Sequence, residues 1–437
     1  MLNTPHLSSK NIFAIPCDDI KRDDGKYLLL YAPLARYGNF LKHSELVQLE
    51  LFLSNKSSFP GENLMGVLEK LSDQMPVPVN RVKNPADACS LTVLPNNKCN
   101  FSCSYCYSSE GHSSKELDLK HLHSVLDFFI DKDRVQNKDL YISFGGGGEP
   151  FLSWNIVENC LVYASEKAED QGFRMNFSFA SNGSVINEEI IQTLKKYRVK
   201  ANISFDILEN IQNLQRKHYD TVCRTLDMLL DADILPSINA VITPLNVLLQ
   251  EKMVEEIARR FPKIKRLSFD QVVDAKLYEH AEDLWKFFSD YTDYFSKARN
   301  LGKSTGVDVN CIKLRNLDLI RDRACPGGFD LTPYGTISSC FFISSPKENL
   351  YAEFIYGKVD ENGRLVFDTE KFHKNQGDSL NGKVQCTGCF AKWHCGGGCH
   401  YQNSTYTTEM LDVFCRFIRE FTRRALIEKW DYPGDLN

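Results

Sequence analysis

The sequence predicts an α/β protein in which helices cover a parallel β-sheet. Between residues 89 and 300, six short apolar runs alternate with stretches whose apolar residues recur at helical spacing. That alternation is typical of parallel sheets with right-handed crossover connections. The predicted strands cover residues 90–95, 139–144, 174–180, 200–205, 237–243 and 264–270.

Helices are predicted between these strands, because apolar residues recur there at i, i+3 and i+4. The clearest run extends from Leu119 to Phe129, and looser runs cover 156–164, 190–194 and 254–257. The long segment 208–231, polar at its start and apolar at its end, is also predicted to be helical.

The first 84 residues form a separate unit. Tyr27–Ala32 is predicted to be a strand, and Glu45–Leu53 and Glu62–Leu71 have helical spacing. A small α+β module is therefore expected at 1–84. Two interpretations stay open for it, a packing extension of the next domain and a module that captures a peptide.

Beyond residue 300 the periodicity fades. Short apolar pieces, glycines and cysteines precede a closing helix at about Leu411–Lys429. A segment with little regular core and many possible ligands is held together by its metals. The expected domains are thus 1–84, 85–300 and 301–437.

Composition excludes several classes of protein. A net charge of −5 gives no electrostatic reason to expect a nucleic acid or a membrane surface as partner. No apolar run approaches the roughly 20 residues of a membrane span, and the polar start is not a secretory signal. Fifteen cysteines in tight spacings favour metal binding in a reducing cytoplasm over disulfides.

Three cysteines follow the first predicted strand. Cys99, Cys103 and Cys106 can surround one compact metal centre from a polar loop. A structural zinc site needs four ligands, and a four-cysteine 4Fe–4S cluster is closed, so three thiolates leave one iron open. Cys89 lies at the far end of the strand, too distant to close the cluster.

A glycine loop follows the second predicted strand. Residues 145–148 are all glycine, and Glu149 and Pro150 come next. Glycines let the backbone approach a ligand closely, and Glu149 can accept an ammonium group. In a parallel sheet both loops lie at the carboxyl ends of strands, where active sites gather. The alternative is a flexible turn.

These two motifs together resemble the radical S-adenosylmethionine (AdoMet) superfamily. The resemblance implies a partial (β/α)6 TIM-like barrel in which the three cysteines hold a 4Fe–4S cluster whose open iron binds AdoMet. The implied cofactor-binding residues are Tyr105, Gly147, Gly148, Glu149, Pro150, Ser181, Asn182, Ser204 and Arg216. Caps, turns and surface ion pairs are the alternative roles for the last four.

A second cysteine set fills the last part of the chain, at residues 325, 340, 386, 389, 395, 399 and 415. Seven thiolates exceed one tetrahedral site, and zinc is the alternative to iron. The set resembles the SPASM extension of radical AdoMet enzymes that modify peptides. The resemblance implies two auxiliary 4Fe–4S clusters, the first with Cys325, Cys340 and Cys399 and the second with Cys386, Cys389, Cys395 and Cys415. Cys311 is the candidate fourth ligand of the first.

A catalytic base is needed if a substrate radical loses a proton as it is oxidised. Asp270 and Asp274 follow the sixth predicted strand, at the end of the barrel that carries the other motifs. Their alternative role is to cap a loop.

The resemblance implies an oxidoreductase that cleaves AdoMet to a 5′-deoxyadenosyl radical. The radical takes hydrogen from a ribosomally made precursor peptide, which is then crosslinked or oxidised. Three 4Fe–4S clusters and a flavodoxin- or ferredoxin-type electron donor are implied. The N-terminal unit loosely resembles leader-recognition modules, which favours such a peptide. The alternatives are an anaerobic sulfatase-maturing enzyme and a non-catalytic iron–sulfur partner. The sequence leaves open the target residue, the bond formed, the precursor and the oligomeric state.

Overall fold

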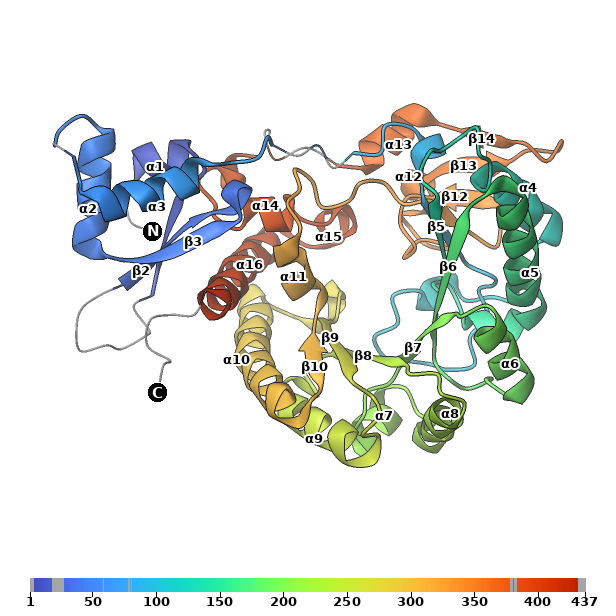
Figure 1. Ribbon diagram of the computed structural model, residues 1–437. Coiled ribbons are helices and arrows are strands. Elements are labelled where there is room, and N and C mark those ends of the chain that lie inside the picture. The colour runs from blue at the N-terminus through green and yellow to red at the C-terminus, as the bar shows by residue number, and fades with distance from the viewer. Residues whose placement is uncertain are drawn as a thin grey trace.

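The computed structural model describes residues 4–17, 27–57, 59–77, 79, 81–377, 380 and 383–430. A curved sheet with helices on its outer side forms most of the molecule, and a small module stands beside it (Figure 1). The mixed α/β fold with a large parallel sheet confirms the predicted fold class.

All six predicted strands are present and parallel, in sequence order across the sheet. Their ends lie within two residues of the predictions. A short seventh strand, β10 (Asp308–Asn310), adds in parallel beside the sixth. The six strands are β4 (Ser90–Val93), β5 (Asp139–Phe144), β6 (Arg174–Ser181), β7 (Lys200–Ser204), β8 (Ser237–Ile242) and β9 (Arg266–Gln271).

The two faces of this sheet differ in polarity. Leu91, Val93 and Ile142 are almost fully buried in the main hydrophobic core. Thr92 and Ser143 alternate with them, so they face the interior of the barrel. The helices outside the sheet are α4 (Leu119–Phe129), α5 (Trp154–Gln171), α6 (Glu188–Lys196), α8 (Tyr219–Asp231) and α9 (Gln250–Arg260).

The predicted helical segment 208–231 is broken in two. It forms α7 (Glu209–Gln215) and then α8, with Lys217 and His218 between them at φ values of +67° and +58°. The left-handed conformation of these two residues ends one helix and starts the next in a new direction. Arg216 is thereby turned from the outer helix layer into the protein, where it is buried.

A long helix that the sequence analysis did not identify, α10 (Ala281–Thr305), packs against the closing helix α16 (Thr408–Lys429). The ring centroids of Phe288 and Phe417 are 4.2 Å apart in a stacked arrangement. Because α10 continues through residue 300, the expected boundary between the second and third domains lies inside a helix.

Short elements make up the C-terminal part. Strand β11 (Asp330–Leu331) adds in parallel to β4, so this part extends the barrel sheet itself. Three antiparallel strands follow it, β12 (Thr336–Ser338), β13 (Ile355–Val359) and β14 (Leu365–Phe367). The short helices here are α11 (Ile312–Arg315), α12 (Tyr351–Phe354), α13 (Thr369–Asn375), α14 (Lys392–Cys395) and α15 (His400–Thr405).

The N-terminal module has an antiparallel three-stranded sheet of order β1-β2-β3. Its central strand is buried on both faces. Leu28 and Leu30 belong to the module's own core, whereas Leu29 and Tyr31 pack into the main core. The elements are α1 (Pro5–Ser9), β1 (Phe13–Pro16), β2 (Tyr27–Ala32), β3 (Tyr37–Lys42), α2 (His43–Leu53) and α3 (Glu62–Ser72).

A buried hydrogen bond joins the module to helix α14. The Tyr31 hydroxyl and His394 Nε2 are 2.8 Å apart, and His394 Nδ1 is 3.1 Å from the carbonyl oxygen of Leu319. Burial lowers the pKa of His394 to about 4, so the ring is neutral. Since a carbonyl only accepts, Nδ1 donates to Leu319 and Nε2 accepts from Tyr31.

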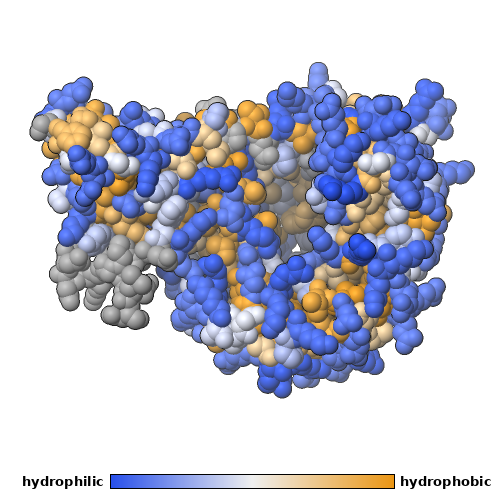
Figure 2. Space-filling model, in the orientation of Figure 1, coloured by the Kyte–Doolittle hydropathy of each residue, from blue (hydrophilic) through white to orange (hydrophobic). Residues whose placement is uncertain are grey.

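Hydrophilic side chains cover much of the face shown in Figure 2, the outer helices included. Among the described residues, no helix combines the length and the apolar character that a bilayer crossing requires.

Replacing Phe288 by alanine should lower the free energy of unfolding by about 3–5 kcal/mol, because a buried ring stacked on α16 is lost and leaves a cavity. Chemical denaturation of the anaerobically purified protein measures the change. Phe59→Ala is the matched control, since that ring is 60% exposed. Equal losses in the two variants would contradict the packing of α10 on α16.

Candidate active site

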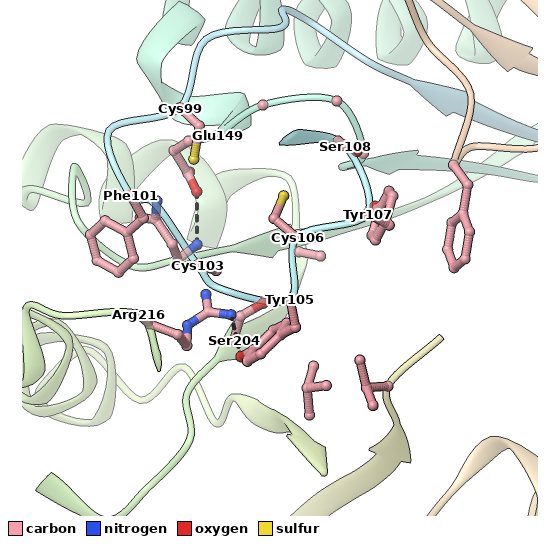
Figure 3. A pocket seen from close by; sticks show the side chains of 18 of the residues that line it. Cys99, Phe101, Cys103, Tyr105, Cys106, Tyr107, Ser108, Glu149, Ser204 and Arg216 are labelled. Carbon is pink, nitrogen blue, oxygen red and sulfur yellow. Dashed lines mark hydrogen bonds between the residues drawn. The ribbon is translucent and has the colours of Figure 1, made fainter. Parts of the chain in front are cut away.

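A cavity of about 310 Å³ opens at the carboxyl ends of the barrel strands. Loops that are far apart in the sequence meet here, and the three cysteines of the first motif face the glycine loop (Figure 3). Of the predicted site residues, those lining the cavity are Cys99, Cys103, Tyr105, Cys106, Gly147, Gly148, Glu149, Ser181, Asn182, Ser204, Arg216 and Asp270.

The cysteine loop is shaped by backbone hydrogen bonds. The Cys106 amide donates to the carbonyl of Cys103 (3.2 Å), and the Ser104 amide donates to that of Gln215 on α7 (2.9 Å). Burial raises the pKa of Cys103 to about 11 and also raises that of Cys99 and Cys106. Each thiol therefore keeps its proton until a bound metal displaces that proton to solvent, as cluster formation requires.

The glycine loop lies directly against the cysteine loop. The Gly148 amide donates to the carbonyl of Asn96 (3.1 Å), and the Glu149 amide donates to that of Lys98 (2.6 Å). A Cβ atom on Gly148 would be 1.9 Å from the oxygen of Lys98, so no other residue fits. Gly147 has a φ of +66°, which also favours glycine.

Glu149 is buried and connects the glycine loop to the end of β6. Its carboxylate accepts from the amide of Asn182 and from the hydroxyl of Ser181, both at 2.7 Å. It also accepts from the amide of Phe151 at 3.3 Å, as the cap of the short helix that starts at Pro150. Burial raises the pKa of Glu149, and these donors oppose that rise.

Below the cysteine loop, Tyr105 and Arg216 meet a buried carboxylate. The Tyr105 hydroxyl donates to both oxygens of Asp206, at 2.9 and 2.8 Å, and accepts from Arg216 Nη1 at 3.0 Å. The Nε of Arg216 is buried without a hydrogen-bond partner among the described residues. The guanidinium thus has a free donor at the wall of the cavity.

The two candidate bases occupy different environments. Asp270 lines the main cavity and accepts from the amide of Ile312 (2.6 Å) and the hydroxyl of Ser268 (2.7 Å). Asp274 lines a neighbouring cavity and accepts from the amide of Lys276, as a helix cap does. The catalytic role of both stays a prediction.

Three polar residues near the cysteines were not singled out from the sequence. Asn96 Nδ2 donates to the carbonyl of Glu149 (3.0 Å), and Asn100 Oδ1 accepts from Asn182 (3.0 Å). His112 Nε2 lies 3.9 Å from the sulfur of Cys106. All three lie close to the cysteines in sequence, which is a usable signal, since His112 is only six residues after Cys106.

The structure brings the second cysteine set together in two groups. Besides burial, Cys399 and Cys325 are among the neighbours that raise the pKa of Cys340. Cys389, Cys395 and Cys415 act in the same way on Cys386. That each group binds a cluster stays a prediction. Among the described residues, no three His, Cys, Asp or Glu side chains converge on a single metal ion.

The structure does not bring Cys311 to the first of these groups. Its fully buried thiol accepts from the amide of Leu314 (3.4 Å), and its charged or hydrogen-bonding neighbours include Tyr291 and Asp270. It follows β10 at one edge of the sheet, whereas β11 and β12, which precede Cys340, lie beyond the opposite strand β4. These contacts do not support the prediction that Cys311 is a ligand.

Comparison with known families gives one match. Residues 93–261 match the Radical SAM superfamily, whose members use AdoMet (SAM). The matched segment begins in β4 and ends after α9, so it contains both the cysteine loop and the glycine loop.

Two curated relatives are similar over different lengths. The radical SAM cyclopropyl synthase TigE of Paramaledivibacter caminithermalis is 29% identical over 164 residues, which are 35% of this chain and 34% of TigE. The cysteine-type anaerobic sulfatase-maturating enzyme of Clostridium perfringens is 23% identical over 363 residues, 77% of this chain and 96% of the enzyme. The chain thus spans only about a third of TigE.

Two solved structures share the fold. Native anSMEcpe with bound AdoMet and Kp18Cys peptide superposes with a TM-score of 0.62 at 18% identity. The match covers 78% of this chain and 99% of the anSMEcpe chain. Streptococcus suis SuiB bound to precursor peptide SuiA has a TM-score of 0.51 at 15% identity. This match covers 92% of this chain and 97% of the SuiB chain.

Replacing Gly148 by alanine should reduce AdoMet binding at least tenfold, because the new Cβ atom forces the glycine loop away from the carbonyl of Lys98. Isothermal titration of the reconstituted protein under anaerobic conditions measures the affinity. Gly66→Ala is the control, since a Cβ atom there meets open space. Unchanged affinity in the Gly148 variant would show that the loop does not shape the AdoMet site.

Proposed function

We propose that this chain, in which residues 93–261 form a radical SAM domain, is a SPASM-type maturase that modifies a ribosomally made peptide. The modification is a crosslink or an oxidation that starts with removal of a hydrogen atom from the peptide. One observation carries the proposal: three half-buried thiols, a glycine cradle and a buried carboxylate line one cavity at the carboxyl ends of a parallel sheet.

The residues present fit a 4Fe–4S cluster with AdoMet on its open iron. Cys99, Cys103 and Cys106 would hold the cluster, and the donor set has no fourth thiol in the cavity. When bound, the cluster and AdoMet supply a 5′-deoxyadenosyl radical, the hydrogen-abstracting agent. The absence of side chains lets the glycine loop lie directly against the cysteine loop, so its backbone lines the cavity beside the cysteines.

The chain's own residues would orient AdoMet and exclude water. Glu149, fixed by Ser181 and Asn182, would accept from the AdoMet amino group, and the free Nε of Arg216 is a donor for its carboxylate or ribose. Ser204 lies on the same wall. Tyr105 holds the cysteine loop to Asp206 and so positions the cluster rather than touching substrate.

Two auxiliary 4Fe–4S clusters in the C-terminal part would accept or relay electrons. The separation of the seven thiols into groups of three and four supports this assignment. Because this part contributes β11 to the barrel sheet, its clusters would be held rigidly relative to the active site.

The N-terminal module would bind the precursor peptide. Among the described residues, β3 pairs only with β2, so its outer edge offers backbone groups to an added strand. The likeness to peptide-bound SuiB, which covers 92% of this chain, supports a module of this kind. A flavodoxin- or ferredoxin-type donor in the cytoplasm would supply electrons.

A sulfatase-maturing reaction is the second candidate, favoured by a sequence match over 96% of the Clostridium perfringens enzyme. A gene for a short peptide next to the gene for this chain would favour the peptide maturase, and a sulfatase gene would favour the alternative.

The reconstituted chain should produce 5′-deoxyadenosine from AdoMet and dithionite under anaerobic conditions. Cys103→Ala should lower that yield at least a hundredfold, because the cluster loses one of its three thiolates. Liquid chromatography measures the product, and Cys89→Ala, at the residue just before strand β4, is the control. Absence of product from the unaltered chain would end the enzyme interpretation.

Iron content tests the auxiliary clusters. The reconstituted chain should hold about twelve irons, and Cys389→Ala combined with Cys395→Ala should lower this to about eight. Colorimetric iron assay with zinc analysis gives both numbers, and Cys160→Ala, in a helix of the barrel, is the control. Four irons, or zinc in place of iron, would contradict the assignment.

A further inference from the structure

The three-cysteine group of the C-terminal part lacks a fourth ligand from the predicted set. Cys311, the candidate, is enclosed by Tyr291 and Leu314 at the other edge of the sheet. A side chain that supplies the fourth ligand must be close to Cys325 and Cys340 and must carry a donor atom that iron accepts.

Asp330 meets the first requirement. It lies on β11, five residues after Cys325. Its partner on the neighbouring strand β12 is Ser338, which is two residues before Cys340. Among charged neighbours, Asp330 has the largest effect on the pKa of Cys340, larger than that of Cys399, and it raises this pKa. It also raises the pKa of Cys325.

The strand register directs Asp330 to the interior of the barrel. Asp330 lies beside Thr92 of β4, which in turn lies beside Ser143 of β5. The residues on either side, Phe329 and Leu331, belong to the hydrophobic core, and Phe329 stacks on Phe129 of α4. Alternation along the strand therefore points the carboxylate away from the helices.

The carboxylate of Asp330 lacks a cationic partner. The residue is 5% exposed, and its one polar side-chain contact is with Thr92. Among the described residues, no lysine, arginine or histidine acts on its charge. A buried carboxylate costs free energy unless a cation balances it. Two nearby thiolates would make that cost larger.

We propose that Asp330 supplies one carboxylate oxygen as the fourth ligand of the cluster held by Cys325, Cys340 and Cys399. This inference rests on the proposed function, because that proposal assigns a cluster to these cysteines. Iron accepts carboxylate oxygen as well as thiolate, and its positive charge would balance the buried groups. One iron of this cluster then differs from the other three.

The contact with Thr92 gives the carboxylate a defined orientation. Thr92 can donate its hydroxyl proton to one carboxylate oxygen, and its own oxygen lies 3.5 Å from the hydroxyl of Ser143. The other oxygen of Asp330 is then free for the metal. Such outer partners fix ligand geometry in metal sites.

The test uses a chain without the cluster of Cys99, Cys103 and Cys106, because the open iron of that cluster would obscure the result. In a Cys99/Cys103/Cys106→Ala chain, reconstitution should give about eight irons, and mild oxidation should give no EPR signal of a three-iron cluster. Asp330→Asn should lose about one iron and show that signal, because an amide binds iron weakly. Asp330→Cys should restore about eight irons and remove the signal.

Cys311→Ala is the matched control and should behave like its parent chain. The inference is overturned if Asp330→Asn leaves both iron content and EPR unchanged, or if Cys311→Ala gives the three-iron signal. If the double variant Cys325→Ala, Cys340→Ala keeps the iron content of its parent chain, the cluster assignment of the proposed function itself is overturned. Far-ultraviolet circular dichroism shows that each variant is folded.

Discussion

The carbonyl oxygen of Lys98 occupies the space in which residue 148 would carry a Cβ atom. This single backbone contact sets the distance between the cysteine loop and the glycine loop, and the rest of the cavity is arranged around it. It arises because β4 and β5 are adjacent and parallel, so that both loops leave the sheet at the same edge. Asn96 and Glu149 strengthen the contact, since the side chain of one donates to the carbonyl of the other.

The parts of the fold that follow local patterns could be predicted from the sequence. The six strands and most of the barrel helices show the expected spacing of apolar residues. Helix α10 was missed although Leu284, Phe287, Phe288 and Tyr291 are buried along it. The break between α7 and α8 could not be predicted, because left-handed conformations at Lys217 and His218 depend on tertiary contacts.

The site shows the same division. Motif residues such as Glu149 were predictable because their chemistry is recorded in short sequences. Asp206 is 101 residues from its partner Tyr105, and only the fold brings the two together. Asn96 and His112 lie close to the cysteines in sequence, but no motif marks their contacts with Glu149 and Cys106. Cys311 illustrates the opposite case, since its position in the chain suggested a ligand while its buried thiol contacts Tyr291 and the amide of Leu314.

The hydrogen bond between Tyr31 and His394 has a thermodynamic consequence. His394 directly precedes Cys395, and its other nitrogen is hydrogen-bonded to Leu319. The hydrogen bond of Tyr31 therefore depends on an ordered conformation of the cysteine-rich segment. Under the proposed function, metal loading of this segment and docking of the module would therefore be linked equilibria: whatever stabilises one would stabilise the other by the same free energy. An iron-starved chain would hold its N-terminal sheet less firmly, and protease sensitivity of one end would measure the occupancy of the other.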